Sequence, residues 1–463
     1  MASQNALFDG LRWSRGNAGS LPRWTVEPRI DAIQKTVESL RPNSKVEVTF
    51  LAEGCFNKVY NTKVDDEELI MRVSLPVDPH YKVNSEVATM NWVRQTTDIP
   101  LPVVLAYDSS QNNNIGFEWI LMTKMPGKPL AKMWASLSPI QKSRLVKNIA
   151  GYFACLFQHQ LRGIGNIHRT PIGAENATSS EQTTPLCHSS KLGETDSSDT
   201  PEDKSTTNPV PDVDRIVSMN FIWSSKVHRD VNRGPFHSAH DWIQALLDLN
   251  EHACWTTLAN APNSFLEEYD EDEIYRATKA QEAIQMLRPL IPEIFPPRDP
   301  SDDPEPSVML HKDLHWCNIL LNDDGEISAI LDWEFVSAVP LWRACNHPLL
   351  LQCPEYYDQP SVEDYAQDED GKVEELYWVH LARYESTLLR KIFLEEMEKL
   401  EPKWVEIHNS TQLQREFLYA MIDCQPDRYV DEIGEWVEKL TKEREGGSVG
   451  ISSDMVDEQR EAS

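Results

Sequence analysis

The segment from Val308 to Phe335 constrains the fold more than any other part of the sequence. An apolar run leads into residues 311–318 (HKDLHWCN), and a second apolar run follows the turn at residues 322–325 (NDDG). An Asp-Gly step between two short apolar runs is typical of a β-hairpin. Asp, Asn and a second Asp stand at the ends of these runs, at positions 313, 318 and 332. Such oxygen groups suit magnesium binding and proton transfer from a hydroxyl, which phosphoryl transfer requires.

This segment resembles the catalytic loop of the aminoglycoside phosphotransferase and choline kinase group, which shares the protein-kinase fold. In that group the loop reads H-x-D-x-x-x-x-N, and a hairpin and an aspartate follow. His311, Asp313, Asn318 and Asp332 match these positions. The resemblance implies that Asp313 is the catalytic base, that His311 braces the loop, and that Asn318 and Asp332 hold Mg²⁺. The alternative is an ordinary hairpin with turn-forming side chains at its ends.

The order of predicted elements agrees with a kinase-like architecture. The N-terminal part predicts a helix and then the order β-β-β-α-β-β, and the C-terminal part is mostly helical. The expected fold class is therefore α+β, a two-lobed protein-kinase-like fold with a small β-rich N-lobe and a large helical C-lobe. The expected parts are an extension (1–44), the N-lobe (45–125), the C-lobe (126–443) with its catalytic loop (308–335) and a disordered insertion (170–212), and a polar tail (444–463).

Several predicted elements have sharper bounds. Helices are expected over 28–42, 83–94, 238–258, 264–288, 373–400 and 411–443, and another helix should begin at the Ser138-Pro139 cap. Strands are expected over 45–51, 68–75, 101–107 and 117–124. Leu11, Trp13 and Trp24 are expected to pack the N-terminal extension against the domain.

The resemblance also implies a nucleotide site in the N-lobe. Gly54 lies in the turn that would cover the phosphates through backbone N–H groups. The third-strand lysine of the fold is replaced by Arg72, with Glu86 as its partner on the next helix; a fungal subset of the group also carries arginine there. Met122 and Lys124 lie on the strand-to-hinge segment that would bind the adenine ring. The alternatives are a plain turn, a surface ion pair and a buried strand.

Composition excludes several partner classes. The formal net charge of −30 disfavours binding to nucleic acid and to anionic membrane surfaces. No apolar run is long enough for a membrane span, and no secretory signal is apparent. The eight cysteines form no C-x-x-C pair, which favours reduced thiols. A cytoplasmic protein is expected, with a mitochondrial location as the alternative because residues 1–30 carry a mild basic excess.

The acceptor half is less defined. Residues 216–241 could line an acceptor pocket or belong to the core, and the acidic stretch 354–371 could attract a cation or be a solvated loop. Trp316 and Trp342 could shape the pocket mouth. The sequence therefore predicts an ATP- and Mg²⁺-dependent phosphotransferase that acts on a hydroxyl of a small molecule. A kinase-like binding or scaffold protein with little catalysis is the alternative, and a protein kinase is a weaker one.

Overall fold

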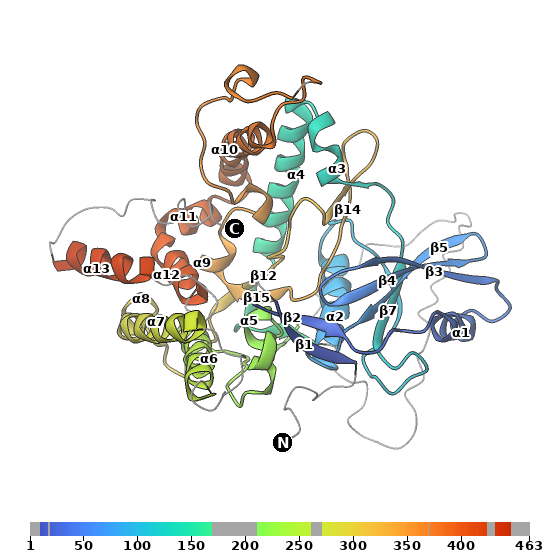
Figure 1. Ribbon diagram of the computed structural model, residues 1–463, viewed down its shortest axis with the longest axis horizontal. Helices are drawn as coiled ribbons and strands as arrows, with labels where there is room; N and C mark the ends of the chain where they lie inside the picture. Colours follow the sequence, from blue (N-terminus) through green and yellow to red (C-terminus); the bar gives the residue numbers. More distant parts are fainter. Residues whose placement is uncertain are drawn as a thin grey trace, which may run out of the picture.

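An antiparallel five-stranded sheet forms the N-terminal lobe (Figure 1). The computed structural model describes residues 10–16, 19–168, 211–260, 271–368, 370–423 and 431–445. The sheet order is β3-β4-β5-β7-β6. Its strands are β3 (Val46–Glu53), β4 (Asn57–Val64), β5 (Glu67–Ser74), β6 (Val104–Asp108) and β7 (Glu118–Thr123). All four predicted strand ranges are confirmed within a few residues.

Two helices cover this sheet. Helix α1 (Ile30–Leu40) packs on β3 through Ile33 and Val37, which are fully buried. Helix α2 (Tyr81–Thr96) is buried along most of its length and shares one apolar cluster with the C-terminal lobe. Because α2 touches both lobes, a change in its position alters the packing between them.

The C-terminal lobe is helical and holds two small sheets. Helix α4 (Pro139–Gln158) begins at a capping box in which Gln141 N donates to the Ser138 hydroxyl, as the Ser-Pro pair predicted. The other described helices are α3 (Leu130–Met133), α5 (Met219–Ile222), α6 (Ala239–Asn260), α7 (Glu271–Leu287), α8 (Ile291–Ile294), α9 (Leu341–Ala344), α10 (Glu375–Leu400), α11 (Pro402–Ser410), α12 (Gln412–Asp423) and α13 (Asp431–Glu445). The predicted two-lobed α+β fold is confirmed.

The two small sheets position the segment that dominated the sequence. One sheet has the order β15-β12-β9, and the other has the order β14-β13-β8. Their strands are β8 (Lys128–Pro129), β9 (Leu161–Arg162), β12 (Pro306–Leu310), β13 (Ile319–Leu321), β14 (Ile327–Ile330) and β15 (Ser337–Pro340). Two-residue strands β10 (Asn166–Ile167) and β11 (Val213–Asp214) form a further pair. The predicted hairpin is therefore β13–β14.

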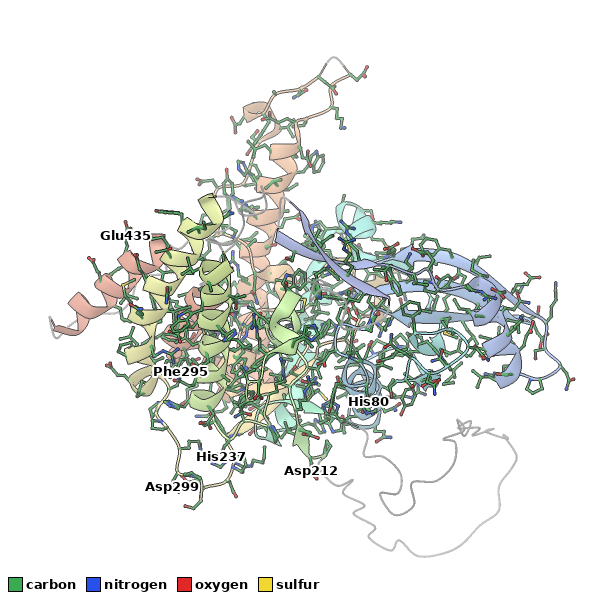
Figure 2. The ribbon with its side chains drawn as sticks, turned by 60° about the horizontal axis from the view of Figure 1, so that its bottom comes forward. His80, Asp212, His237, Phe295, Asp299 and Glu435 are labelled. Atoms are coloured by element: carbon green, nitrogen blue, oxygen red, sulfur yellow. The ribbon has the colours of Figure 1, made fainter. Side chains whose placement is uncertain are left out.

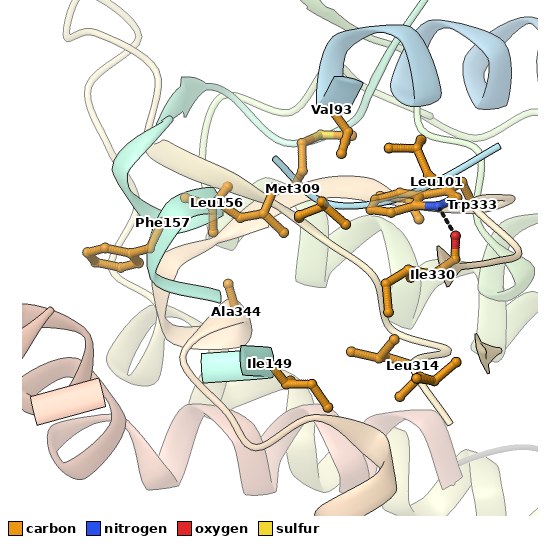
Figure 3. Packing of buried hydrophobic residues seen from close by; sticks show 14 of the residues in the cluster. Val93, Leu101, Ile149, Leu156, Phe157, Met309, Leu314, Ile330, Trp333 and Ala344 are labelled. Carbon is orange, nitrogen blue, oxygen red and sulfur yellow. Dashed lines mark hydrogen bonds between the residues drawn. The ribbon is translucent and has the colours of Figure 1, made fainter. Parts of the chain in front are cut away.

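An apolar core lies directly beneath this hairpin. Figure 3 shows Met309, Leu314, Ile330, Trp333 and Ala344 converging from β12, the loop, β14 and α9. The indole N–H of Trp333 donates to the Ile330 carbonyl at 3.0 Å. This packing fixes the polar segments on either side of the hairpin.

The N-terminal extension is a β-hairpin, which the sequence did not predict. Strands β1 (Leu11–Gly16) and β2 (Gly19–Trp24) pair in register. They contain no Val, Ile or Thr, so the usual strand signal is missing. The predicted packing is confirmed: Leu11 is buried, the Trp13 ring lies 5.3 Å from Trp223, and the Trp24 ring lies 5.0 Å from Phe117.

Other predictions lie partly or wholly outside the described residues. The helix expected over 411–443 is described as α12 and α13, and residues 424–430 lie outside the described residues. The insertion predicted over 170–212 lies outside the described residues up to position 210, and so does the tail beyond Glu445. No helix among the described residues is long and apolar enough to cross a membrane. The six described cysteines are free thiols.

Candidate active site

His311 fixes the start of the loop between β12 and β13. Its side chain is buried, and its ring packs edge-on against Trp333 with centroids 5.0 Å apart. Burial lowers the pKa of His311, so the ring is neutral. The ring Nε2 lies 2.9 Å from the Leu331 carbonyl, which can only accept, so Nε2 carries the proton. The residue ties the loop to the segment that contains Asp332, consistent with the bracing role predicted for it.

Asp313 and Asn318 face each other across the same loop. The amide nitrogen of Asn318 donates to the Asp313 carbonyl at 3.0 Å and to its carboxylate at 3.3 Å. His315 Nε2 lies 3.7 Å from that carboxylate, while His315 Nδ1 accepts from Cys317 N at 3.1 Å. The Asp313 side chain is 46% exposed, so a substrate hydroxyl can reach it. With its nitrogen engaged, Asn318 has its amide oxygen left for a metal.

Asp332 follows β14 in a left-handed backbone conformation, with φ of 61°. Aspartate tolerates this region better than most residues, and such conformations gather at functional sites. Burial and, to a smaller extent, the charge of Glu334 raise the pKa of Asp332 to about 7 against the opposing effect of Arg72. One carboxylate oxygen, Oδ1, is buried without a hydrogen-bond partner and lies 3.6 Å from Arg72 Nη1. A buried carboxylate oxygen in that state is suited to a cation.

The pair predicted from the third strand is present. Arg72 on β5 forms an ion pair with Glu86 on α2, and both side chains are buried. The same guanidinium faces Asp332, so it connects the sheet, α2 and the hairpin. An ion pair this deeply buried is not the surface pair that was the alternative, because either charge alone would be strongly destabilising there.

A second buried network lies beside the first, and the sequence did not reveal it. Lys82 Nζ lies 2.6 Å from Glu334 Oε2 and 3.0 Å from Asn57 Oδ1. The Asn57 amide also donates to Glu334 at 2.8 Å, and the Ser74 hydroxyl donates to Asn57 at 2.8 Å. Burial disfavours the charged form of Glu334, but Lys82 and Arg72 outweigh it and lower its pKa. The available signal was that Lys82 stands one helical turn before Glu86, on the same face of α2.

The turn between β3 and β4 owes its position to Phe56 more than to Gly54. The Phe56 ring lies 5.3 Å from Phe335 and 5.9 Å from Trp223, so it anchors the turn on the C-terminal lobe. Gly54 N donates to Asn57 O at 2.8 Å, and the nearest atom to a Cβ at position 54 would be 3.9 Å away. Position 54 therefore does not require glycine for space.

The strand-to-hinge segment docks on the β13–β14 hairpin. Met122 is buried near the end of β7, and the Lys124 side chain pairs with Glu68 at 2.9 Å. The Lys124 ammonium group is therefore engaged by Glu68. A Cβ at Gly127, which has φ of 117°, would lie 2.4 Å from Ser328 Oγ and 2.6 Å from Leu321 O. Only glycine fits this contact.

Most of the residues considered for the acceptor pocket belong to the apolar core. Phe221 and Phe236 are fully buried, as the core interpretation expected. Trp342 is also buried, against Trp242 and Phe295, so it does not shape a pocket mouth. Trp316 packs edge-on against a neighbouring indole at 4.2 Å. The described acidic side chains of 355–370 are exposed, and the stretch that leads into α10 projects from the body of the molecule (Figure 2), as a solvated loop would.

The residues beside the β13–β14 hairpin fit a magnesium ion. Asp332 supplies an unpartnered carboxylate oxygen, Asn318 supplies an amide oxygen, and both are hard ligands of the kind Mg²⁺ prefers. Among the described residues there is no cluster of three or more His, Cys, Asp or Glu that could hold a metal alone. This is expected where the protein gives one or two ligands and substrate phosphates give others.

Known proteins resemble this chain over much of its length. A family model described as "Phosphotransferase enzyme family" matches residues 47–342. A subtelomeric hrmA-associated cluster protein of Aspergillus fumigatus is 33% identical over 127 residues, covering 27% of this chain and 25% of that protein. Altered inheritance of mitochondria protein 9, mitochondrial, of Saccharomyces cerevisiae is 22% identical over 374 residues, covering 73% of this chain and 55% of that protein.

These matches span a quarter to about half of those curated relatives. Both relatives are fungal, which confirms the predicted resemblance to a fungal subset. Among solved structures, aminoglycoside phosphotransferase APH(4)-Ia aligns with a TM-score of 0.43 at 12% identity, covering 91% of this chain and 100% of that chain.

Proposed function

Because the chain belongs to the phosphotransferase enzyme family, we propose that it transfers the γ-phosphoryl group of ATP to a hydroxyl of a small molecule with the help of Mg²⁺. One observation carries this proposal. Asp313 and Asn318 share one loop, Asp332 follows two strands later, and the Leu331 N–H donates to the Asn318 carbonyl at 2.8 Å, so the three residues lie together beside the β13–β14 hairpin. The Arg72–Glu86 pair faces Asp332 from the other lobe. A plain hairpin has no need of this arrangement.

Each residue has a distinct role in the proposed reaction. The exposed carboxylate of Asp313 accepts the proton of the acceptor hydroxyl as its oxygen attacks the γ-phosphorus and ADP departs. Arg72, held by Glu86, donates to the phosphates. His311 keeps the loop in register with the Asp332 segment. Asn318 and Asp332 would hold the metal, which when bound neutralises charge on the phosphates.

The N-lobe turn and hinge complete the nucleotide site. Backbone N–H groups near Gly54 would cover the phosphates, and the segment around Met122 and Lys124 would take the adenine ring. Phe56 supports this proposal because it holds the turn against Phe335, three residues beyond Asp332.

Turnover of the Asp313→Asn variant tests the proposal. We expect ADP release in the presence of Mg²⁺ and a pool of hydroxylated metabolites, and we expect Asp313→Asn to abolish it while leaving ATP binding intact. Asp323→Asn is the matched control, because that carboxylate is 91% exposed in the hairpin turn and pairs only with Lys128 at the surface. Equal turnover in wild type and Asp313→Asn would refute the role of the base.

A kinase-like binding protein with little catalysis is the second candidate. Arginine in place of lysine at position 72, and a phosphate-covering turn that does not need its glycine, favour it. Nucleotide-dependent stabilisation separates the two candidates: ATP with Mg²⁺ should raise the melting temperature of the enzyme. No such rise would favour the scaffold.

For location, we propose the cytoplasm, with the mitochondrion as the alternative. The name of the Saccharomyces cerevisiae relative, which includes "mitochondrial", favours the mitochondrion. Fluorescence microscopy of the tagged full chain decides between them.

A further inference from the structure

Two half-buried cationic side chains come from the segment that follows β12 and from α9, the helix that packs on β12. Lys312 directly precedes Asp313, and its ammonium group lies 5.8 Å from the centre of the Phe335 ring. Arg343 is on α9, and its guanidinium lies 5.7 Å from the centre of the Tyr419 ring. Both cations are half-buried. In the part of the chain that the structure describes, neither forms an ion pair with a carboxylate.

The small sheets bring these cations together. Strand β12 leads into Lys312, strand β15 leads into α9, and the two strands pair from Ser307 to Leu310. Helix α9 packs on β12, and Figure 1 shows it beside both strands. The chain beyond α9 then returns to the catalytic loop, where Leu350 N donates to the Leu314 carbonyl at 3.1 Å. Arg343 is therefore held next to the loop by the fold.

The electrostatics of Lys312 indicate a site with excess positive charge. Burial and, to a smaller extent, the charge of Arg343 lower the pKa of Lys312 to about 8, while Asp313 and Glu334 act in the opposite direction. Glu334 is already paired with Lys82 at 2.6 Å and accepts from Asn57. The acidic groups near Lys312 thus do not neutralise both cations, although the whole chain carries a net charge of −30.

Two neighbouring cations without a carboxylate partner destabilise the folded protein unless an anionic group binds them. We propose that Lys312 and Arg343 bind an anionic group, a carboxylate or a phosphate ester, on the same acceptor molecule whose hydroxyl is phosphorylated. This inference rests on the proposed phosphotransferase function and adds the charge class of the acceptor. An ammonium and a guanidinium suit such groups through charge-assisted hydrogen bonds.

The acidic stretch before α10 does not argue against an anionic acceptor. Its described carboxylates are exposed, and the stretch projects from the body of the molecule in Figure 2. Selection of the acceptor depends on the charges that touch it, and Lys312 directly precedes the base.

Matched acceptors of different charge test the proposal. ADP release would be measured with glycerol, glycerate, glycerol 3-phosphate and choline, at one ionic strength, for wild type, Lys312→Met and Arg343→Met. We expect an anionic acceptor to have the highest kcat/KM, and each variant to raise its KM by about tenfold with a smaller change in kcat. Glycerate against glycerol 3-phosphate distinguishes the two anionic groups. Preference for glycerol or choline would overturn the inference.

The matched control is Lys403→Met, which removes a 59% exposed lysine on α11 that pairs with Glu406. It should leave the KM of every acceptor unchanged.

A binding measurement covers the case in which none of these compounds is turned over. The nucleotide site would be saturated with Mg²⁺ and a non-hydrolysable ATP analogue, and the melting temperature followed against added glycerol 3-phosphate, with sodium chloride as the salt control. Stabilisation in wild type that is lost in Lys312→Met and retained in Lys403→Met supports the anion site. Equal stabilisation of wild type and Lys312→Met, or none at all, contradicts it. If the ATP analogue itself does not bind, the proposed function is contradicted. This outcome is distinguishable, because stabilisation by the analogue and the dependence of anion stabilisation on Lys312 are measured separately.

Discussion

The ammonium group of Lys82 on α2 lies 2.6 Å from the carboxylate of Glu334, two residues after Asp332. This ion pair joins the N-terminal lobe to the segment that carries a candidate metal ligand. Lys82 is fully buried and Glu334 nearly so. The position of Asp332 is therefore set from both lobes.

We predict that Lys82→Met destabilises the protein by about 3–5 kcal/mol, because Glu334 would remain as a buried and unpaired charge. Urea unfolding followed by tryptophan fluorescence measures the loss. Adding Glu334→Gln should recover part of the lost stability, since the double variant removes both charges of the Lys82–Glu334 pair. Lys399→Met, which removes a 64% exposed partner of Glu396, should cost no more than about 1 kcal/mol. Equal losses in the two lysine variants would contradict the prediction.

We predict that Arg72→Met lowers kcat/KM for ATP by about a hundredfold, because a donor to the phosphates is lost. Arg72→Lys should lose less, since it keeps the charge but not the forked geometry that serves both Glu86 and the phosphates. Steady-state ADP formation against ATP concentration measures both. Folding is checked by circular dichroism, because the unpaired Glu86 also destabilises Arg72→Met. Wild-type kinetics in a folded Arg72→Met protein would remove Arg72 from the nucleotide site.

Gly127→Ala should destabilise the protein by about 2–4 kcal/mol, whereas Gly54→Ala should change stability little. A Cβ at position 127 would lie 2.6 Å from the Leu321 carbonyl, and the backbone there has φ of 117°. At position 54 the nearest atom is 3.9 Å away and the backbone is ordinary. Thermal unfolding of the two variants gives the comparison. A Gly127→Ala protein as stable as wild type would show that the segment around Gly127 can move away from the β13–β14 hairpin without loss of stability.

The protein should lose stability as the pH falls from about 6.5 toward 4. Burial lowers the pKa of His408 from its usual 6.5 to about 4, with Arg415 adding to the shift and a hydrogen bond to the Cys345 carbonyl opposing it. The neutral ring is therefore favoured in the folded state, and its stabilising contribution is present above pH 6.5 and lost as the pH falls to the folded pKa.

This shift corresponds to roughly 3 kcal/mol. His347, whose ring lies 5.0 Å from that of His408, also has a lowered pKa because of burial and should steepen the loss. Urea unfolding at several pH values would measure the slope. His408→Gln should flatten it, and an unchanged slope in His408→Gln would assign the acid sensitivity to other groups.

The parts of the site that the sequence predicted are those encoded locally. Asp313 and Asn318 stand on one short loop, and the hairpin that follows has its own turn signal, so the family resemblance could be recognised from their spacing. The resemblance extends to Arg72 and Glu86 because strand and helix follow each other directly. Asn57 and Glu334 are 277 positions apart, and their bond depends on how two lobes meet, which no local pattern contains.

The same reasoning explains the errors in the fold. The β1–β2 hairpin has no β-branched residues, so only its tertiary contacts identify it. Trp342 was considered for the mouth of a pocket, but it is buried against Trp242 and Phe295, which come from elsewhere in the chain.

The N-terminal hairpin bridges the two lobes through its tryptophans. Trp24 rests on Phe117 in the sheet lobe, and Trp13 rests on Trp223 in the helical lobe. A rotation that separates the lobes must break one of these aromatic contacts, at a cost of about 1 kcal/mol. The hairpin therefore resists separation of the two lobes, and shortening either tryptophan should make that separation easier.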